Sequence, residues 1–113
     1  MSKRSDKLYL KDILDSIEKL EGYTNNLNYE EFSENPMVID AAVRNFEIIG
    51  EATKNLSREI KSSNYDIPWK EMAGMRNKVI HEYFGVNLKI VWKTIKERLP
   101  ELKIKIKEIS KNL

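Results

Sequence analysis

Four side chains in the second half of the chain have the types and the spacing that proton transfer and electrostatic catalysis require. Arg76 and Asn77 are followed by His81 and, two residues later, by Tyr83. The guanidinium group stays charged at physiological pH, whereas an imidazole gains and loses a proton near neutrality. His81 is the only histidine, and cysteine is absent. Acid–base chemistry near pH 7 must therefore use this imidazole or carboxylates.

A single helix over residues 68–83 would bring these groups together. At about 100° per residue, the apolar residues of this helix lie within roughly 60° of Arg76. We therefore predict that Arg76 stands in the middle of an apolar arc, where an unpaired charge is unfavourable. Asn77 and His81 are four residues apart and hence neighbours on the shoulder of that arc. The arc contains Trp69, Met72, Ala73, Val79, Ile80 and Tyr83.

Each of these residues also has a structural explanation. A buried arginine commonly forms an ion pair, and Glu47 and Glu51 on the preceding helix are available. A lone histidine on a helix shoulder is often packed or solvated. Tyr83 would fit at the edge of a core with its hydroxyl at the rim. The combination of all four groups on adjoining stripes favours the functional interpretation.

This segment resembles a known family. Residues 76–83 read Arg-Asn-Lys-Val-Ile-His-Glu-Tyr and match the Arg-x4-His motif of the HEPN superfamily, with a polar residue after the arginine. The added His-x-Tyr resembles the HepT-like branch. The similarity extends over nearly the whole chain, at residues 9–14, 44–52, 67–69, 83–86, 91–92 and 99–102.

The resemblance implies an all-α fold, an up-and-down bundle of four to five helices. It also implies a homodimer in which the motif helices of both subunits line one cleft. It also implies the toxin of a type II toxin–antitoxin system, a metal-independent endoribonuclease that cleaves cellular RNA (mRNA or tRNA) without a cofactor. Arg76, Asn77 and His81 would be catalytic. The partner would be a minimal nucleotidyltransferase antitoxin, which adds AMP to Tyr83.

The residues suit this chemistry. Metal-free RNA cleavage needs a base for the 2′-hydroxyl proton, an acid for the leaving 5′-oxygen and a cation for the charged phosphorane. His81 can transfer protons, Arg76 can bind phosphoryl oxygens, and Asn77 can orient the imidazole or hold the phosphate. One histidine cannot be base and acid at once, so catalysis needs the second His81 of a dimer or a water molecule. The expected product carries a 2′,3′-cyclic phosphate.

The position of Tyr83 fits the modification. It lies seven residues, or about two turns, from Arg76 on the same stripe. An attached AMP could therefore cross the cleft, place its phosphate at Arg76 and block RNA. Two other functions stay open: a non-catalytic dimer that binds a nucleotide or docks a nucleotidyltransferase, and a purely structural bundle.

Composition limits the alternatives. With 113 residues, one domain over residues 1–113 is expected. The absence of cysteine and the single histidine exclude a disulfide scaffold and a multi-histidine metal site. Net charge is +2, but residues 89–113 hold eight basic and three acidic side chains. This basic segment is either a solvated helix face or a surface for RNA or the antitoxin. No membrane span or signal peptide is evident, so a cytoplasmic protein is expected.

Hydrophobic periodicity predicts helices throughout. We expect a first helix over about residues 8–20, a capped turn at 29–32, and a helix from Asn35-Pro36 to about residue 56. A polar connection covers residues 57–66, and a further helix over 88–99 should end where Pro100 breaks it. Residues 102–107 alternate with period two, which is typical of a strand, but Ile109 and Leu113 fit only a helix, so a last helix is predicted.

Overall fold

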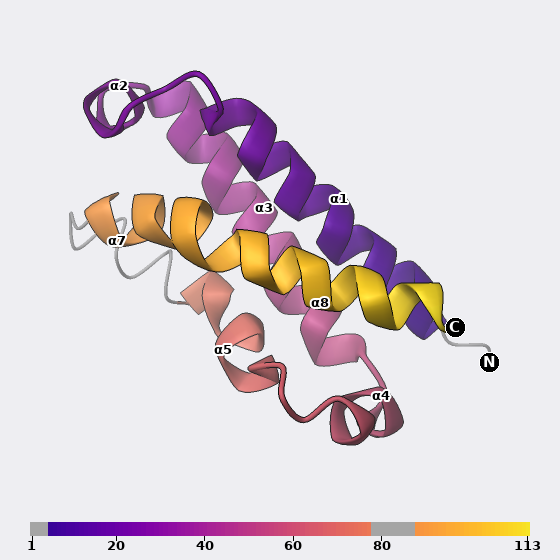
Figure 1. The fold of residues 1–113 in the computed structure, drawn as a ribbon. Helices are drawn as coiled ribbons and strands as arrows, with labels where there is room; N and C mark the ends of the chain where they lie inside the picture. The colour runs from indigo at the N-terminus through magenta and orange to yellow at the C-terminus, as the bar shows by residue number, and fades with distance from the viewer. Residues whose placement is uncertain (1–4, 78–87) are drawn as a thin grey trace.

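Helices are the only regular elements in residues 5–77 and 88–113, the ranges that the computed structural model describes (Figure 1). The predicted all-α class is therefore confirmed. No helix in these ranges is long and apolar enough to cross a membrane. The elements are α1 (Asp6–Thr24), α2 (Tyr29–Ser33), α3 (Pro36–Asn55), α4 (Arg58–Ser63), α5 (Trp69–Ala73), α7 (Leu88–Lys93), the π-helical turn η1 (Thr94–Arg98) and α8 (Leu99–Lys111).

The core lies between three long helical segments. In Figure 1, α1 and α3 run antiparallel beside each other, and α8 packs against α1. Each segment presents apolar residues three or four positions apart, which places them on one face of a helix. The fully buried side chains include Leu10, Ile13, Ile17, Leu20, Phe46, Ile49, Leu99, Leu102 and Ile106.

The predicted helix starts are confirmed by their caps. The Asn28 side chain accepts a hydrogen bond from the Glu31 N–H at 2.8 Å, while Glu31 Oε1 accepts from the Asn28 N–H at 3.0 Å, which forms a capping box. Asn35 caps α3 by accepting from the Val38 N–H at 3.1 Å. These bonds satisfy backbone donors that have no partner inside a helix.

The region predicted as a polar connection, residues 57–66, contains the short helix α4. The Ser57 Oγ caps it by accepting from the Ile60 N–H, and the Asp6 carboxylate accepts hydrogen bonds from both the N–H and the hydroxyl of Ser57. A six-residue helix buries one side chain, Ile60, so the apolar periodicity is too short to detect.

Pro100 lies in the first turn of the last helix, α8, which agrees with the predicted last helix, but the prediction that it breaks the preceding helix is wrong. The chain is helical from Leu88 to Lys111, and the missing N–H of Pro100 is accommodated by the π-helical turn η1. There the Leu99 N–H donates to the Thr94 carbonyl, five residues back. The helical prediction for residues 102–107 is confirmed, with Ile106 and Ile109 buried against the core.

Candidate active site

The segment that carries Arg76 is anchored at its beginning. The Trp69 indole N–H donates to the carbonyl oxygens of Lys61 and Asn64, at 3.2 Å and 3.0 Å. Ile67 and Met72 are buried in the core. These contacts fix the start of α5 against α4 and α3.

The predicted single helix over residues 68–83 is interrupted within its described part. Helix α5 ends at Ala73, Gly74 forms a turn, and helical backbone resumes at residues 75–77. Glycine is the weakest helix former after proline, which explains why the interruption falls there. The remainder of the predicted helix, including His81 and Tyr83, lies outside the described residues.

The structure does not bury Arg76 among apolar residues, so this part of the prediction is wrong. The residues of the predicted arc that lie outside the described residues are Val79, Ile80 and Tyr83. The side chains that enter the core are Met72 and Met75, both at most 1% exposed. The Arg76 side chain, in contrast, is 45% exposed, and the following Asn77 is exposed as well.

Close backbone packing against α3 places Arg76. A Cβ atom added at Gly50 would lie 3.2 Å from the Ala73 carbonyl oxygen, 3.3 Å from the Arg76 Cβ and 3.4 Å from the Arg76 N. Any side chain larger than hydrogen at position 50 would therefore press on the segment from Ala73 to Arg76.

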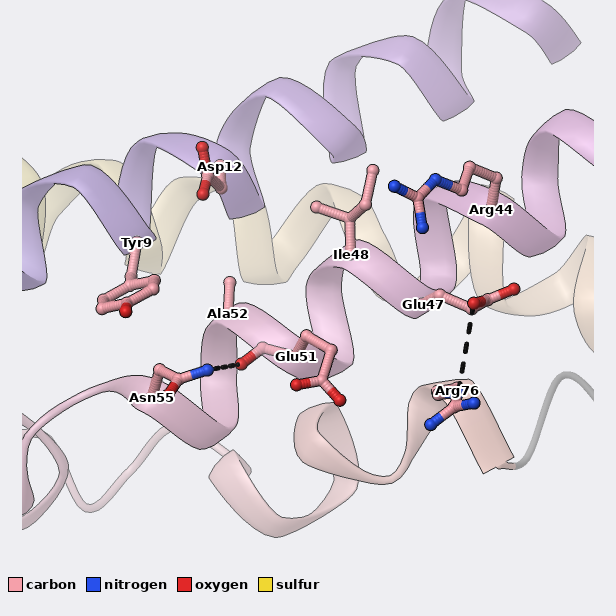
Figure 2. A pocket seen from close by; sticks show the side chains of 9 residues that line it. All are labelled: Tyr9, Asp12, Arg44, Glu47, Ile48, Glu51, Ala52, Asn55 and Arg76. Atoms are coloured by element: carbon pink, nitrogen blue, oxygen red, sulfur yellow. Dashed lines mark hydrogen bonds and ion pairs between the residues drawn. The ribbon is translucent and has the colours of Figure 1, made fainter. Parts of the chain in front are cut away.

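Arg76 borders a groove of about 420 Å³ between α1, α3 and its own segment (Figure 2). The Arg76 Nε lies 4.0 Å from Glu47 Oε2, and the two side chains are 45% and 31% exposed. The ion pair with Glu47 that the sequence allowed is therefore present as a solvent-screened surface pair, which contributes about 0–1 kcal/mol. The groove is lined by Tyr9, Asp12, Arg44, Glu47, Ile48, Glu51, Ala52, Asn55 and Arg76.

Sequence reasoning named Glu47 and Glu51 as possible partners of Arg76 but did not identify Arg44, Asn55, Tyr9 and Asp12 as parts of one groove with them. Arg44, Glu51 and Asn55 follow one another at intervals of seven and four residues along α3 and therefore share one helical face. That spacing was the available signal, but the sequence did not indicate that Tyr9 and Asp12 of α1 form the opposite wall. Within the described residues, no three His, Cys, Asp or Glu side chains are grouped so that they could hold a metal ion.

A second contact connects α5 to the π-helical turn η1, which lies later in the chain. Arg98 in η1 donates from Nε and Nη2 to the two carboxylate oxygens of Glu71, at 3.1 Å and 3.0 Å. Nη1 of the same guanidinium donates to Glu101. The hydrogen bonds that Arg98 donates to the carboxylates of Glu71 and Glu101 raise its pKa above the ordinary value. A bidentate pair of this kind fixes the orientation of α5 relative to α8.

The comparison with known families agrees with the all-helical fold. The family model described as "Ribonuclease HepT-like" matches residues 13–109. The chain belongs to the HepT-like ribonuclease family. No solved structure matches it significantly.

Several relatives are similar over almost their entire length. The protein named "Probable ribonuclease HepT" from Thermococcus cleftensis is 46% identical over 109 residues, which is 96% of this chain and 99% of that protein. A relative from Caldanaerobacter subterraneus subsp. tengcongensis with a provisional RNase name is 46% identical over 94% of this chain and 95% of its own. A third relative, from Methanocaldococcus jannaschii, also has a provisional RNase name. It is 43% identical over 100% of this chain and 93% of its own length.

The tight contact at Gly50 leads to a stability prediction. We expect Gly50→Val to lower the free energy of unfolding by about 1–3 kcal/mol, because the added methyl groups overpack backbone atoms that cannot withdraw. Urea or thermal unfolding measures this change. Gly22→Val in α1 is the matched control, because no atom lies within 4 Å of a Cβ there. Equal stability of the two variants would contradict the close packing.

Proposed function

We propose that the chain is a metal-independent endoribonuclease that cleaves cellular RNA, mRNA or tRNA, and is the toxin of a type II toxin–antitoxin system. Its membership in the HepT-like ribonuclease family supports the activity on RNA. The observation that carries the proposal is the exposed Arg76 guanidinium at the edge of a 420 Å³ groove, where a phosphate can reach it.

In the proposed reaction the 2′-oxygen of a ribose attacks the adjacent phosphorus, and the bond from phosphorus to the 5′-oxygen breaks. His81 takes the 2′-hydroxyl proton, and the leaving oxygen receives a proton from a second His81 in a homodimer or from water. Arg76 stabilises the charge that develops on the phosphoryl oxygens. Asn77, exposed beside Arg76, orients the imidazole or holds the phosphate.

We expect purified protein to cleave total RNA in the presence of EDTA, and Arg76→Ala and His81→Ala each to lower the rate by at least about 100-fold. Because Arg76 is a surface residue, Arg76→Ala should change the free energy of unfolding by less than about 1 kcal/mol. Gel-based cleavage assays and thermal melts measure both effects. Arg58→Ala, an exposed arginine of α4 away from the groove, is the control and should keep full activity.

Two outcomes of this experiment would contradict the proposal. RNA that stays intact with well-folded protein would favour a non-catalytic subunit that binds a nucleotide or docks a nucleotidyltransferase. Cleavage that persists in Arg76→Ala and His81→Ala would assign the activity to other residues.

The proposed partner is a minimal nucleotidyltransferase antitoxin that transfers AMP to the Tyr83 hydroxyl. The transfer forms a bond from the tyrosine oxygen to the α-phosphorus of ATP and releases pyrophosphate. The added phosphate would compete with RNA for Arg76. The attached AMP would thereby neutralise the toxin, because its negative charge repels RNA and its bulk fills the site.

Intact-mass measurement after co-expression with such an antitoxin tests this step. We expect the chain to gain the mass of at least one AMP unit and the Tyr83→Phe chain to gain none. Tyr65→Phe is the control, because Tyr65 is 88% exposed and hence open to unspecific modification. Nucleotidyl mass on the Tyr83→Phe chain would refute the assignment of the acceptor.

A further inference from the structure

Arg76 contacts α3 at two residues, Gly50 and Glu47. Its Cβ and backbone N pack against Gly50, where there is no side chain to separate the two segments. Glu47 lies three residues, or about one helical turn, before Gly50 and therefore on the same face of α3. Its carboxylate lies beside the guanidinium, with Oε2 4.0 Å from Nε.

The contact involves one particular edge of the guanidinium. Figure 2 shows Glu47 on the Nε side, with the two terminal nitrogens of Arg76 directed away from it. A guanidinium can bind an anion in a bidentate manner through Nε and one terminal nitrogen or through both terminal nitrogens. A carboxylate at Nε leaves the end with two terminal nitrogens for a phosphate.

We propose that Glu47 is a positioning residue of the ribonuclease site: it holds the Nε edge of Arg76 so that the terminal nitrogens face the scissile phosphate. This inference rests on the proposed RNA cleavage. Glu47 does not touch RNA in this arrangement and acts only through Arg76.

The charge of Glu47 has a second, opposite effect. A carboxylate close to the phosphate repels it, so Glu47 weakens ground-state binding of RNA while it orients the group that stabilises the transition state. Removing it should therefore lower kcat and leave KM unchanged or lower. A residue with a merely structural role would not separate the two constants in this direction.

The experiment measures kcat and KM for an oligoribonucleotide in EDTA with the full-length chain. We expect Glu47→Ala to lower kcat by about tenfold and Glu47→Gln to lower it less, because the dipole of the amide oxygen still attracts the Nε edge of the guanidinium. Unfolding free energies should stay within about 1 kcal/mol of the parent chain, since the pair is exposed. Glu59→Ala on α4, outside the groove, is the matched control with unchanged constants.

A double substitution tests whether Glu47 acts through Arg76. Lysine keeps the charge but has no Nε–H and no planar fork, so Arg76→Lys should retain residual activity without the contact to Glu47. We expect Glu47→Ala to cause no further loss of kcat in the Arg76→Lys chain. An additional tenfold loss there, or an unchanged kcat in Glu47→Ala alone, would overturn the proposal.

The positioning can also be measured without RNA. The NMR order parameter of the Arg76 Nε–H bond should be lower in Glu47→Ala than in the parent chain or in Glu59→Ala, because the guanidinium loses the carboxylate that attracts its Nε edge. Equal order parameters would overturn the proposal even if the protein cleaves RNA. A higher order parameter in a parent chain that cleaves no RNA would refute the proposed function and with it the catalytic consequence of the contact.

Discussion

The close packing of α3 against the segment from Ala73 to Arg76 determines where the candidate site lies. Gly50 lets the backbone of that segment approach α3 so closely that a Cβ atom at position 50 would stand 3.2–3.4 Å from three of its atoms. The buried residues Met72 and Met75 hold the segment from the core side, and the bond between Arg98 and Glu71 holds α5 from η1. Arg76 therefore emerges at a defined place on the wall of the groove, although its own ion pair is weak.

This arrangement explains how a chain with little excess charge can act on a polyanion. The groove has two arginines, Arg44 and Arg76, and three carboxylates. Its overall charge does not attract RNA, so specific placement of a guanidinium must replace a broad basic surface. In our proposal two subunits also compensate for the single imidazole per chain, because each contributes one His81.

Much of the fold could be predicted from the sequence because its signals are local. The caps at Asn28 and Asn35 and the apolar stripes of α1, α3 and α8 act within a few residues, and the structure confirms them. The position of Arg76 could not be predicted in this way. The prediction assumed one uninterrupted helix across Gly74. The contact with α3 determines instead which side of the segment from Ala73 to Arg76 faces the core. The π-helical turn before Pro100 likewise depends on packing that residue types do not reveal. His81 and Tyr83 lie outside the described residues, and their roles stay predictions.

The central claim is that Arg76 and His81 catalyse an attack of the 2′-hydroxyl on the adjacent phosphate without a metal ion. Mass spectrometry of the ends of RNA fragments, produced by the full-length protein in EDTA, tests it most directly. Our account predicts a 2′,3′-cyclic phosphate on one fragment and a 5′-hydroxyl on the other. Fragments with a 3′-hydroxyl and a 5′-phosphate, or cleavage that begins only when a divalent cation is added, would contradict it.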